Sequence, residues 1–239
     1  MSAMLAVDVW RGDVAGGHLQ RFTVPRLTSQ TVLDVVTEIQ RTQDPTLSYR
    51  FACRVGMCGS CAMMVNGRAR WTCRTHVAEV MQGDTLELRP LRNLPVIRDL
   101  VTDMSVFFDK LTQAHGRFQG ARTRHDEVVP VQPASKERRA ADASIECIGC
   151  GVCYASCDVV AQRPDYLGPA ALNRAWSLVN DERDVGNASR LEAVLDAAGA
   201  PACHTQMNCT ANCPKHLPLT GAIAGLKRVG TRAWLRSEP

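Results

Sequence analysis

The chain has 239 residues, which is too long for a single minimal module and fits two compact domains. Its hydrophobic content of 45% and charged content of 22% are ordinary for a globular protein, and no apolar run approaches the roughly 18 residues that a membrane-spanning helix needs. The net charge of +4 is small and dispersed, which argues against a nucleic-acid partner.

The first part of the chain is predicted to be a small α+β unit. Apolar residues alternate over 5–9 as in a strand and recur at helical spacing over 32–39. Asn66-Gly67, between two short apolar runs, is a strong hairpin signal. This hairpin is expected to bring Cys61 and Cys73 towards each other.

The rest of the chain is predicted to be helical after a connector. Apolar residues over 96–108 favour an amphipathic helix that ends the first domain, and the aperiodic, polar segment 116–144 is interpreted as the connector. Three further helices are expected over 170–179, 190–198 and 219–229. The predicted division is therefore a first domain over 1–112, a connector over 113–144 and a second, all-α domain over 145–239.

Cysteines are the most informative residues of the chain. There are eleven, an odd number, and the start MSAMLAVDVWRGD lacks a basic region followed by an apolar run, so no signal peptide is predicted. Together these features argue against a disulfide framework and favour metal or redox chemistry.

The first cysteine set has the spacing of a plant-type [2Fe–2S] ferredoxin. Its members are Cys53, Cys58, Cys61 and Cys73. Gly56 and Gly59 are expected to let the loop wrap closely and aim backbone N–H groups at the sulfurs. A four-cysteine zinc site is the alternative, but such sites usually present two close cysteine pairs.

Two further cysteine sets predict two more clusters. The second set covers 147–157, and the third is Cys203-x5-Cys209-x3-Cys213-Pro214, whose last cysteine follows an x3 gap before proline. The spacing C-x2-C-x2-C-x3-C of 147–157 is typical of bacterial ferredoxins, in which the fourth cysteine serves the other cluster. By this crossing rule a [4Fe–4S] cluster takes Cys147, Cys150, Cys153 and Cys213. Cys157, Cys203 and Cys209 remain, and these three thiolates predict a [3Fe–4S] cluster. Asp158 stands where such a run usually has proline.

Five segments together carry a family resemblance: CRVGMCGSCAMMVNGRARWTC, LPVIRDLVTDM, CIGCGVCYASC, PDYLGPAAL and CHTQMNCTANCPKHLP. In these segments and in their order, the chain resembles the iron–sulfur subunit of succinate dehydrogenase and fumarate reductase. The resemblance implies an N-terminal β-grasp [2Fe–2S] ferredoxin-like domain followed by an all-α helical ferredoxin domain.

The function implied by the resemblance is electron transfer. Electrons would pass between FAD in a separate flavoprotein subunit and a quinone through the [2Fe–2S], [4Fe–4S] and [3Fe–4S] clusters, in either direction. The resemblance also implies membrane anchor subunits, with this chain as a peripheral subunit on the cytoplasmic side of the inner (plasma) membrane. The chain shows no recognisable FAD or dicarboxylate site, so it is not expected to oxidise succinate alone.

The resemblance also implies two candidate residues for the quinone site. His204, which follows Cys203, is a candidate hydrogen-bond donor, and a structural role beside the cluster is its alternative. Gln162 occupies the position of a tryptophan in ubiquinone-type members, which favours menaquinone, a modified site or a different acceptor.

Two other functions remain open at the level of sequence. Cysteine spacing reports cofactors and not the distant substrate, so the chain could serve a different flavin-dependent dehydrogenase. Alternatively, the cysteines could hold zinc in a binding module without redox activity.

Overall fold

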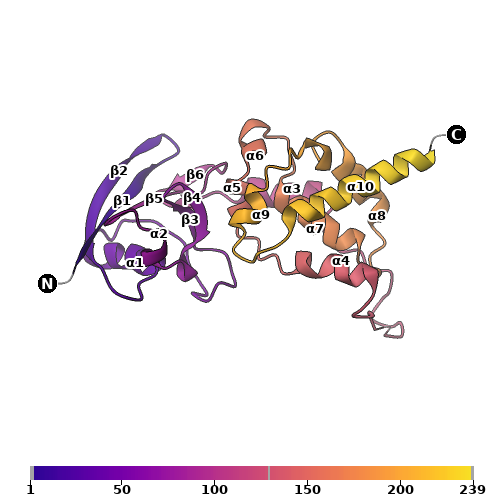
Figure 1. Ribbon diagram of the computed structural model, residues 1–239, viewed down its shortest axis with the longest axis horizontal. Coiled ribbons are helices and arrows are strands. Elements are labelled where there is room, and N and C mark those ends of the chain that lie inside the picture. The colour runs from indigo at the N-terminus through magenta and orange to yellow at the C-terminus, as the bar shows by residue number, and fades with distance from the viewer. Residues whose placement is uncertain (1–2, 129, 238–239) are drawn as a thin grey trace. The chain divides into compact units, whose positions relative to one another are not determined.

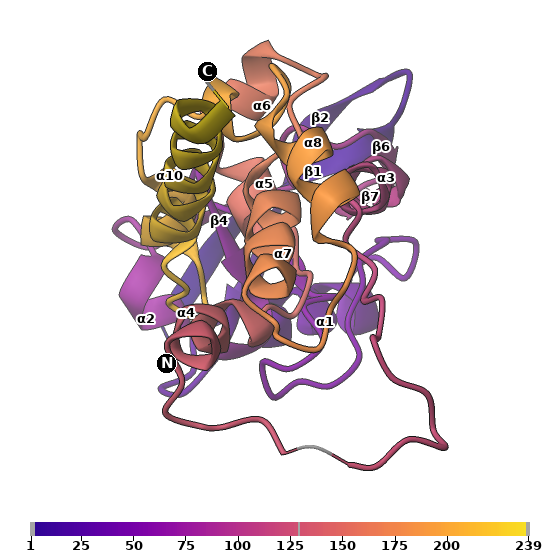
Figure 2. The ribbon, with the colours of Figure 1, turned by 90° about the vertical axis from the view of Figure 1, so that its right-hand side faces the viewer.

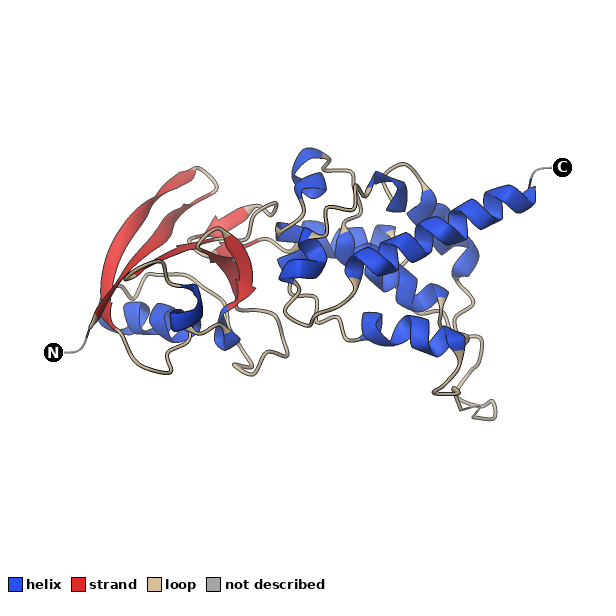
Figure 3. Cartoon of the chain, in the orientation of Figure 1, coloured by secondary structure: helices blue, strands red, loops and turns tan. Residues whose placement is uncertain are grey.

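The computed structural model describes residues 3–128 and 130–237, and their contacts divide the chain into two compact units. The first unit runs to Met104 and also contains Ile148–Ser156, whereas the second contains Ser105–Cys147 and the residues from Cys157 onward. Figure 3 shows strands in the first unit and a predominance of helices in the second. This division differs from the one expected from the sequence, because the short segment after Cys147 packs with the first unit.

The first unit is built on a seven-stranded sheet among the described residues (Figure 1). The strands are β1 (Met4–Asp13), β2 (Gly16–Pro25), β3 (Ala62–Val65), β4 (Arg68–Trp71), β5 (Thr85–Arg89), β6 (Val96–Arg98) and β7 (Val101–Thr102). The order is β4-β3-β5-β1-β6-β7, with β2 paired to β1. Strand β1 runs antiparallel to β2 and parallel to β5, so the expected strand over 5–9 is confirmed.

Helix α1 (Val32–Thr42) supplies the apolar layer that covers this sheet. Its N-terminus carries a capping box, in which the Thr31 hydroxyl accepts from the N–H of Asp34 and the Asp34 carboxylate accepts from the N–H of Thr31. The apolar face of α1 is fully buried in the core formed with β1 and β5. A helix on a sheet with a central parallel pair is the predicted β-grasp arrangement.

The β3–β4 hairpin is confirmed at Asn66-Gly67. Both residues have positive φ, 46° and 76°, as a two-residue type I′ turn requires. After β4 the chain enters a short 3₁₀ helix, η1 (Thr72–Arg74), which carries Cys73. The first unit also contains two single-turn helices, α2 (Val77–Val80) and α5 (Val152–Ala155).

The helix predicted over 96–108 is wrong in its first half. Residues 96–102 form β6 and β7, and helix α3 begins only at Ser105 and ends at Gln113. Asp99 turns the chain between the strands with a φ of 49°, and its buried carboxylate accepts the N–H groups of Gly12 and Ser48. Contacts distant in sequence therefore outweighed the helical spacing of the apolar residues.

The second unit is helical, as predicted. Besides α3 it contains α4 (Lys136–Ile145), α6 (Asp158–Gln162), α7 (Pro169–Val179), α8 (Asn187–Leu195), η2 (Ala200–Ala202), α9 (Asn208–Asn212) and α10 (Leu219–Ser237). Helix α7 contacts α3, α4, α8 and α10 and forms the centre of the unit (Figure 2). The helices expected over 170–179, 190–198 and 219–229 correspond to α7, α8 and α10.

The predicted connector contains a helix, α4, that its local sequence pattern does not predict. Helix α4 is capped by the Ser135 hydroxyl, which accepts from the N–H of Arg138. Two side chains of α7 also hold it: Trp176 Nε1 donates to the carbonyl of Ala140 at 3.0 Å, and Asn173 Nδ2 donates to that of Ser144 at 3.1 Å. These tertiary bonds stabilise a segment whose own sequence shows no clear apolar period.

Candidate iron–sulfur sites

The first candidate site is the loop 53–61 of the first unit. Arg54, Gly56 and Gly59 all have positive φ, 58°, 73° and 72°, so the chain coils tightly between the cysteines. A Cβ on Gly56 would lie 2.7 Å from the Trp71 ring. The two glycines therefore allow a close approach that any side chain would block, as predicted for a loop wrapped around a cluster.

Backbone N–H groups of this loop point at sulfur. Cys53 Sγ accepts from the N–H groups of Val55, Met57 and Cys58 at 3.5, 3.3 and 3.3 Å, and Cys61 Sγ accepts from the N–H of Cys73 at 3.4 Å. Donors converging on a sulfur stabilise the thiolate that iron requires. The residues present thus fit a [2Fe–2S] cluster.

The four thiols of this site differ in environment. Cys61 and Cys73 are buried, whereas Cys58 is exposed and Cys53 is half-buried. Hydrogen bonds from the Ser60 side chain and from backbone groups lower the pKa of Cys58 to about 6, while burial and the neighbouring Cys61 raise the pKa of Cys73 to about 11. The Cys73 thiol therefore needs a positive partner to ionise, and iron would supply it.

The second unit brings Cys157, Cys203 and Cys209 together around one small cavity. Thr205 N–H donates to Cys203 Sγ at 3.4 Å, and Thr220 Oγ1 lies 3.8 Å from Cys209 Sγ. Burial raises the pKa of Cys157 and of Cys209 above the ordinary thiol value. Among the described residues lining this cavity there is no fourth cysteine, so the donor set fits the three-thiolate cluster predicted from the cysteine count.

Tyr166 lines the same cavity and was not anticipated from the sequence. Its side chain is 1% exposed, and burial together with the three nearby thiols raises its pKa, so the phenol stays protonated. Lys227 of α10 was also missed, although its Nζ donates to the carbonyl of Cys203 at 2.7 Å. Tyr166 lies in the segment PDYLGPAAL, but nothing local to that segment predicts its place beside the thiols, and Lys227 lies in none of the cysteine runs.

The two candidate quinone-site residues lie differently. His204 is exposed and lines the cavity of Cys157, Cys203 and Cys209, as its sequence position suggests. Gln162 is the last residue of α6, is exposed, and is not among the described residues that line the cavity.

The predicted [4Fe–4S] ligands belong to different parts of the chain. Cys150 and Cys153 lie in the segment that packs with the first unit, and Cys153 is within α5. Cys147 and Cys213 belong to the second unit. The proposal that these four cysteines share one cluster rests on their spacing.

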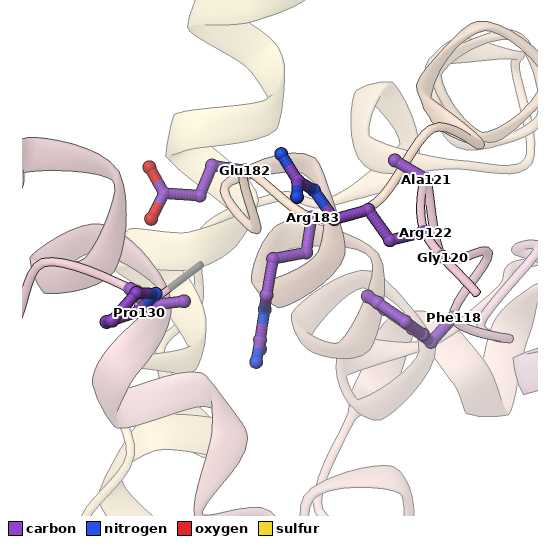
Figure 4. Close-up of a pocket in the computed structure, with 8 residues that line it drawn as sticks. Phe118, Gly120, Ala121, Arg122, Pro130, Glu182 and Arg183 are labelled. Atoms are coloured by element: carbon purple, nitrogen blue, oxygen red, sulfur yellow. The ribbon is translucent and has the colours of Figure 1, made fainter. Parts of the chain in front are cut away.

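A second cavity in the helical unit carries no cysteine. Phe118, Arg122, Glu182 and Arg183 line it (Figure 4). Arg183 is held by the carboxylate of Asp181 at 2.8 Å and lies over the Phe118 ring, and Arg122 donates to the carbonyl of Glu127. Both guanidinium groups are thus engaged within the chain, and we assign no function to this cavity.

Comparison with known proteins agrees with this geometry. Residues 6–109 match the family model of the 2Fe-2S iron-sulfur cluster binding domain, and residues 143–217 match that of the 4Fe-4S dicluster domain. A sheet-rich ferredoxin-like domain followed by a helical dicluster domain defines an iron–sulfur electron-transfer protein. The zinc-holding alternative is not favoured.

Relatives extend the match over nearly the whole chain. The chain is 39% identical to the fumarate reductase iron-sulfur subunit of Mycobacterium tuberculosis, over 94% of this chain and 91% of the relative. It is 34% identical to that of Wolinella succinogenes, over 95% and 98%, and 38% identical to the mitochondrial succinate dehydrogenase [ubiquinone] iron-sulfur subunit of Dictyostelium discoideum, over 82% and 70%. The chain belongs to the family of iron–sulfur subunits of fumarate reductase and succinate dehydrogenase.

A solved structure supports the same conclusion. A chain of the Mycobacterium smegmatis Sdh1 complex in the apo form is 30% identical, with a TM-score of 0.86 and 98% of each chain covered. The protein is therefore an electron-transfer subunit of an oxidoreductase, and a different flavin-dependent dehydrogenase is not favoured as its complex. Among the described residues, no helix has the length and apolar character needed to cross a bilayer.

Proposed function

We propose that this chain conducts electrons between FAD in a flavoprotein subunit and a quinone. The electrons would pass through three clusters in the order [2Fe–2S], [4Fe–4S] and [3Fe–4S], or in the reverse order. The observation that carries the proposal is the convergence of Cys157, Cys203 and Cys209 on one cavity. This convergence leaves four cysteines for each of the other two clusters. When bound, the clusters supply reversible one-electron chemistry.

The protein residues would provide cysteine ligands, hydrogen-bond donors to the sulfurs and apolar packing around the clusters. Cys53, Cys58, Cys61 and Cys73 would hold the [2Fe–2S] cluster, and Cys147, Cys150, Cys153 and Cys213 would hold the [4Fe–4S] cluster. Backbone N–H groups directed at Cys53 and Cys203 would stabilise thiolates in both states of oxidation. Apolar packing around the buried ligands would exclude water from the iron.

The decisive experiment is electron paramagnetic resonance on the anaerobically purified complex, with iron and zinc analysis. We expect a [3Fe–4S] signal from the oxidised protein, and [2Fe–2S] and [4Fe–4S] signals as dithionite is added. Cys209→Ser should remove the first signal selectively, and Cys58→Ser should remove or alter only the [2Fe–2S] signal. Zinc in place of iron, or a full-strength [3Fe–4S] signal in Cys209→Ser, would refute the assignment.

The partners are proposed from family membership. A FAD-containing flavoprotein subunit would exchange electrons with this chain, and membrane anchor subunits would hold the complex at the cytoplasmic side of the inner (plasma) membrane. Co-purification of the tagged chain should recover a flavin-containing subunit in a membrane fraction. Release of the tagged chain from the membrane when the anchor genes are deleted would support peripheral attachment, whereas retention would contradict it.

The quinone would bind near the cavity of Cys157, Cys203 and Cys209, with His204 as a hydrogen-bond donor. Because His204 is exposed at that cavity, its imidazole can reach a bound headgroup. We expect His204→Ala to slow quinone reduction while leaving cluster reduction by succinate intact. His125→Ala, which changes an exposed histidine away from the cavity, is the control.

Quinone type is a separate part of the proposal. Gln162 replaces the tryptophan of ubiquinone-type members, which favours menaquinone or a modified site. Gln162→Trp should raise turnover with ubiquinone analogues relative to menaquinone analogues. An unchanged ratio of turnover with ubiquinone analogues to turnover with menaquinone analogues would mean that Gln162 does not determine which quinone is used.

A further inference from the structure

Two threonines connect helix α10 to one cysteine of the three-thiol cavity. Thr220, in the first turn of α10, has its Oγ1 3.8 Å from Cys209 Sγ and 2.9 Å from Thr210 Oγ1. The N–H of Thr220 donates to Thr210 Oγ1 at 3.0 Å. Cys209 and Thr210 are consecutive residues of α9, so the two helices meet through this short chain of polar atoms.

Which atom donates in each of these contacts follows from the chemistry of a metal-bound cysteine. A hydroxyl has one proton to donate, and a thiolate ligand has none, so it can only accept. Once Cys209 is a ligand, Thr220 is therefore the donor in the contact between Thr220 Oγ1 and Cys209 Sγ. Thr220 Oγ1 is then free to accept from the Thr210 hydroxyl, whose own oxygen already accepts the Thr220 N–H.

We propose that Thr220, oriented by Thr210, donates a hydrogen bond to the Cys209 thiolate and thereby raises the reduction potential of the cluster held by Cys157, Cys203 and Cys209. This inference rests on the three-cluster function proposed above. Reduction adds one electron and increases the negative charge on the ligand sulfurs, so a donor stabilises the reduced form more than the oxidised form. The proton stays on Thr220, and no covalent bond forms or breaks.

Thr210 contributes chiefly by orientation, although its own side chain and N–H also lie within hydrogen-bonding reach of the Cys209 sulfur. Because the Thr210 hydroxyl donates to Thr220 Oγ1, it polarises the Thr220 hydroxyl and leaves the Thr220 proton directed at Cys209 Sγ. Without Thr210, the Thr220 hydroxyl could still reach Cys209 but would lose this alignment. Thr210 is thus a positioning residue, and its effect should have the same sign as that of Thr220 and be smaller.

The test is a redox titration of the purified complex, followed through the paramagnetic signal of the oxidised [3Fe–4S] cluster. At the midpoint potential of the wild type, where oxidised and reduced forms are equal, we expect about a two- to tenfold excess of oxidised cluster in Thr220→Val, as the loss of one hydrogen bond implies. Thr220→Ser, which keeps the hydroxyl, should restore the wild-type ratio. Thr210→Val should give a smaller shift in the same direction.

Thr231→Val is the matched control. Thr231 lies on the same helix, but its hydroxyl donates to the carbonyl of Lys227 rather than to a sulfur, so the titration should be unchanged. A fully assembled cluster in Thr220→Val with the wild-type midpoint would overturn the inference. If Thr220→Val fails to assemble the cluster, a wild-type midpoint in Thr210→Val overturns it. Absence of the [3Fe–4S] signal from the wild type would instead refute the function on which the inference rests.

Discussion

Gly59 of the [2Fe–2S] loop lies directly against Cys150: a Cβ placed on Gly59 would be 2.5 Å from Cys150 Cβ and 2.7 Å from its Cα. Both residues belong to the first unit. Because Cys150 is a predicted ligand of the [4Fe–4S] cluster, the predicted binding loop of one cluster touches a predicted ligand of another. Only glycine permits this approach. The φ of 72° at Gly59 is a second reason why glycine is needed at this position, because other residues rarely adopt it.

We therefore expect Gly59→Ala to disturb the loop and weaken or abolish the [2Fe–2S] signal of the reduced protein. The methyl group would clash with backbone and side-chain atoms of Cys150, which cannot give way as the end of a flexible side chain can. Gly83→Ala is the control, because Gly83 has a φ of 60° but open space at the Cβ position. Equal signals in both variants would mean that the contact with Cys150 does not decide the outcome.

Lys227 should influence the cavity of Cys157, Cys203 and Cys209 through its charge. Its ammonium group donates to the carbonyl of Cys203, and a nearby positive charge favours the reduced cluster. Lys227→Met should raise the oxidised-to-reduced ratio of the [3Fe–4S] cluster at fixed potential by at least about fivefold. Arg228→Met, on the adjacent exposed position, should have a much smaller effect, and equal effects would contradict a specific role for Lys227.

Arg190 is expected to be essential for stability of the helical unit. Its fully buried guanidinium bonds both carboxylate oxygens of Asp184, at 2.8 and 3.1 Å, and the carbonyls of His115 and Arg117. Arg190→Met leaves the buried Asp184 charge unpaired, which costs about 3–5 kcal/mol.

Thermal unfolding of the complex, followed by cluster absorbance, would measure this loss. Arg183→Met is the matched control, because Arg183 forms its ion pair with Asp181 while half exposed, and such pairs contribute only about 0–1 kcal/mol. Similar midpoints for the two variants would contradict the importance of the buried pair.

The same ion pair predicts a dependence of stability on pH. Burial alone would raise the pKa of Asp184, but hydrogen bonds from Arg190 and from the N–H groups of Gln119 and Gly186 outweigh it and lower the pKa below the ordinary 3.8. A depressed folded-state pKa contributes stability above the unfolded pKa, which is lost as the pH falls through the folded value. Asp184→Asn should therefore flatten the decline of unfolding temperature below about pH 4, and an unchanged slope would assign the decline to other carboxylates.

Helix α1 offers a test within the sheet-containing unit. Thr31→Ala removes the hydroxyl that accepts the Asp34 N–H and should lower stability by about 1 kcal/mol. Thr42→Ala removes a hydroxyl that only donates to the Glu38 carbonyl within the last turn, so a smaller loss is expected. Circular dichroism during denaturation would measure both, and an equal loss would mean that the cap is not important.

Much of the architecture followed from local signals. The Asn66-Gly67 turn, the apolar face of α1 and the apolar faces of α7, α8 and α10 were predicted because each depends on neighbours a few residues away. Helix α4 and the strands over 96–102 were missed, since bonds from Trp176 and Asn173 hold the first, and the buried Asp99 turns the chain within the second. Their conformations depend on residues that the local pattern does not contain.

For the candidate sites, the sequence by itself predicts the ligands, because iron favours thiolates and the spacings of the eleven cysteines are expected to divide them among three clusters. It also determined that glycine must occupy the tightest positions of the first loop. Only the tertiary structure decided which groups surround the sulfurs: Thr220 and Tyr166 line the three-thiol cavity, and Lys227 donates to the carbonyl of Cys203, each from outside the cysteine runs. Ligand choice is a matter of residue chemistry, whereas the hydrogen bonds and charges that tune a cluster depend on packing between elements, which no local spacing encodes.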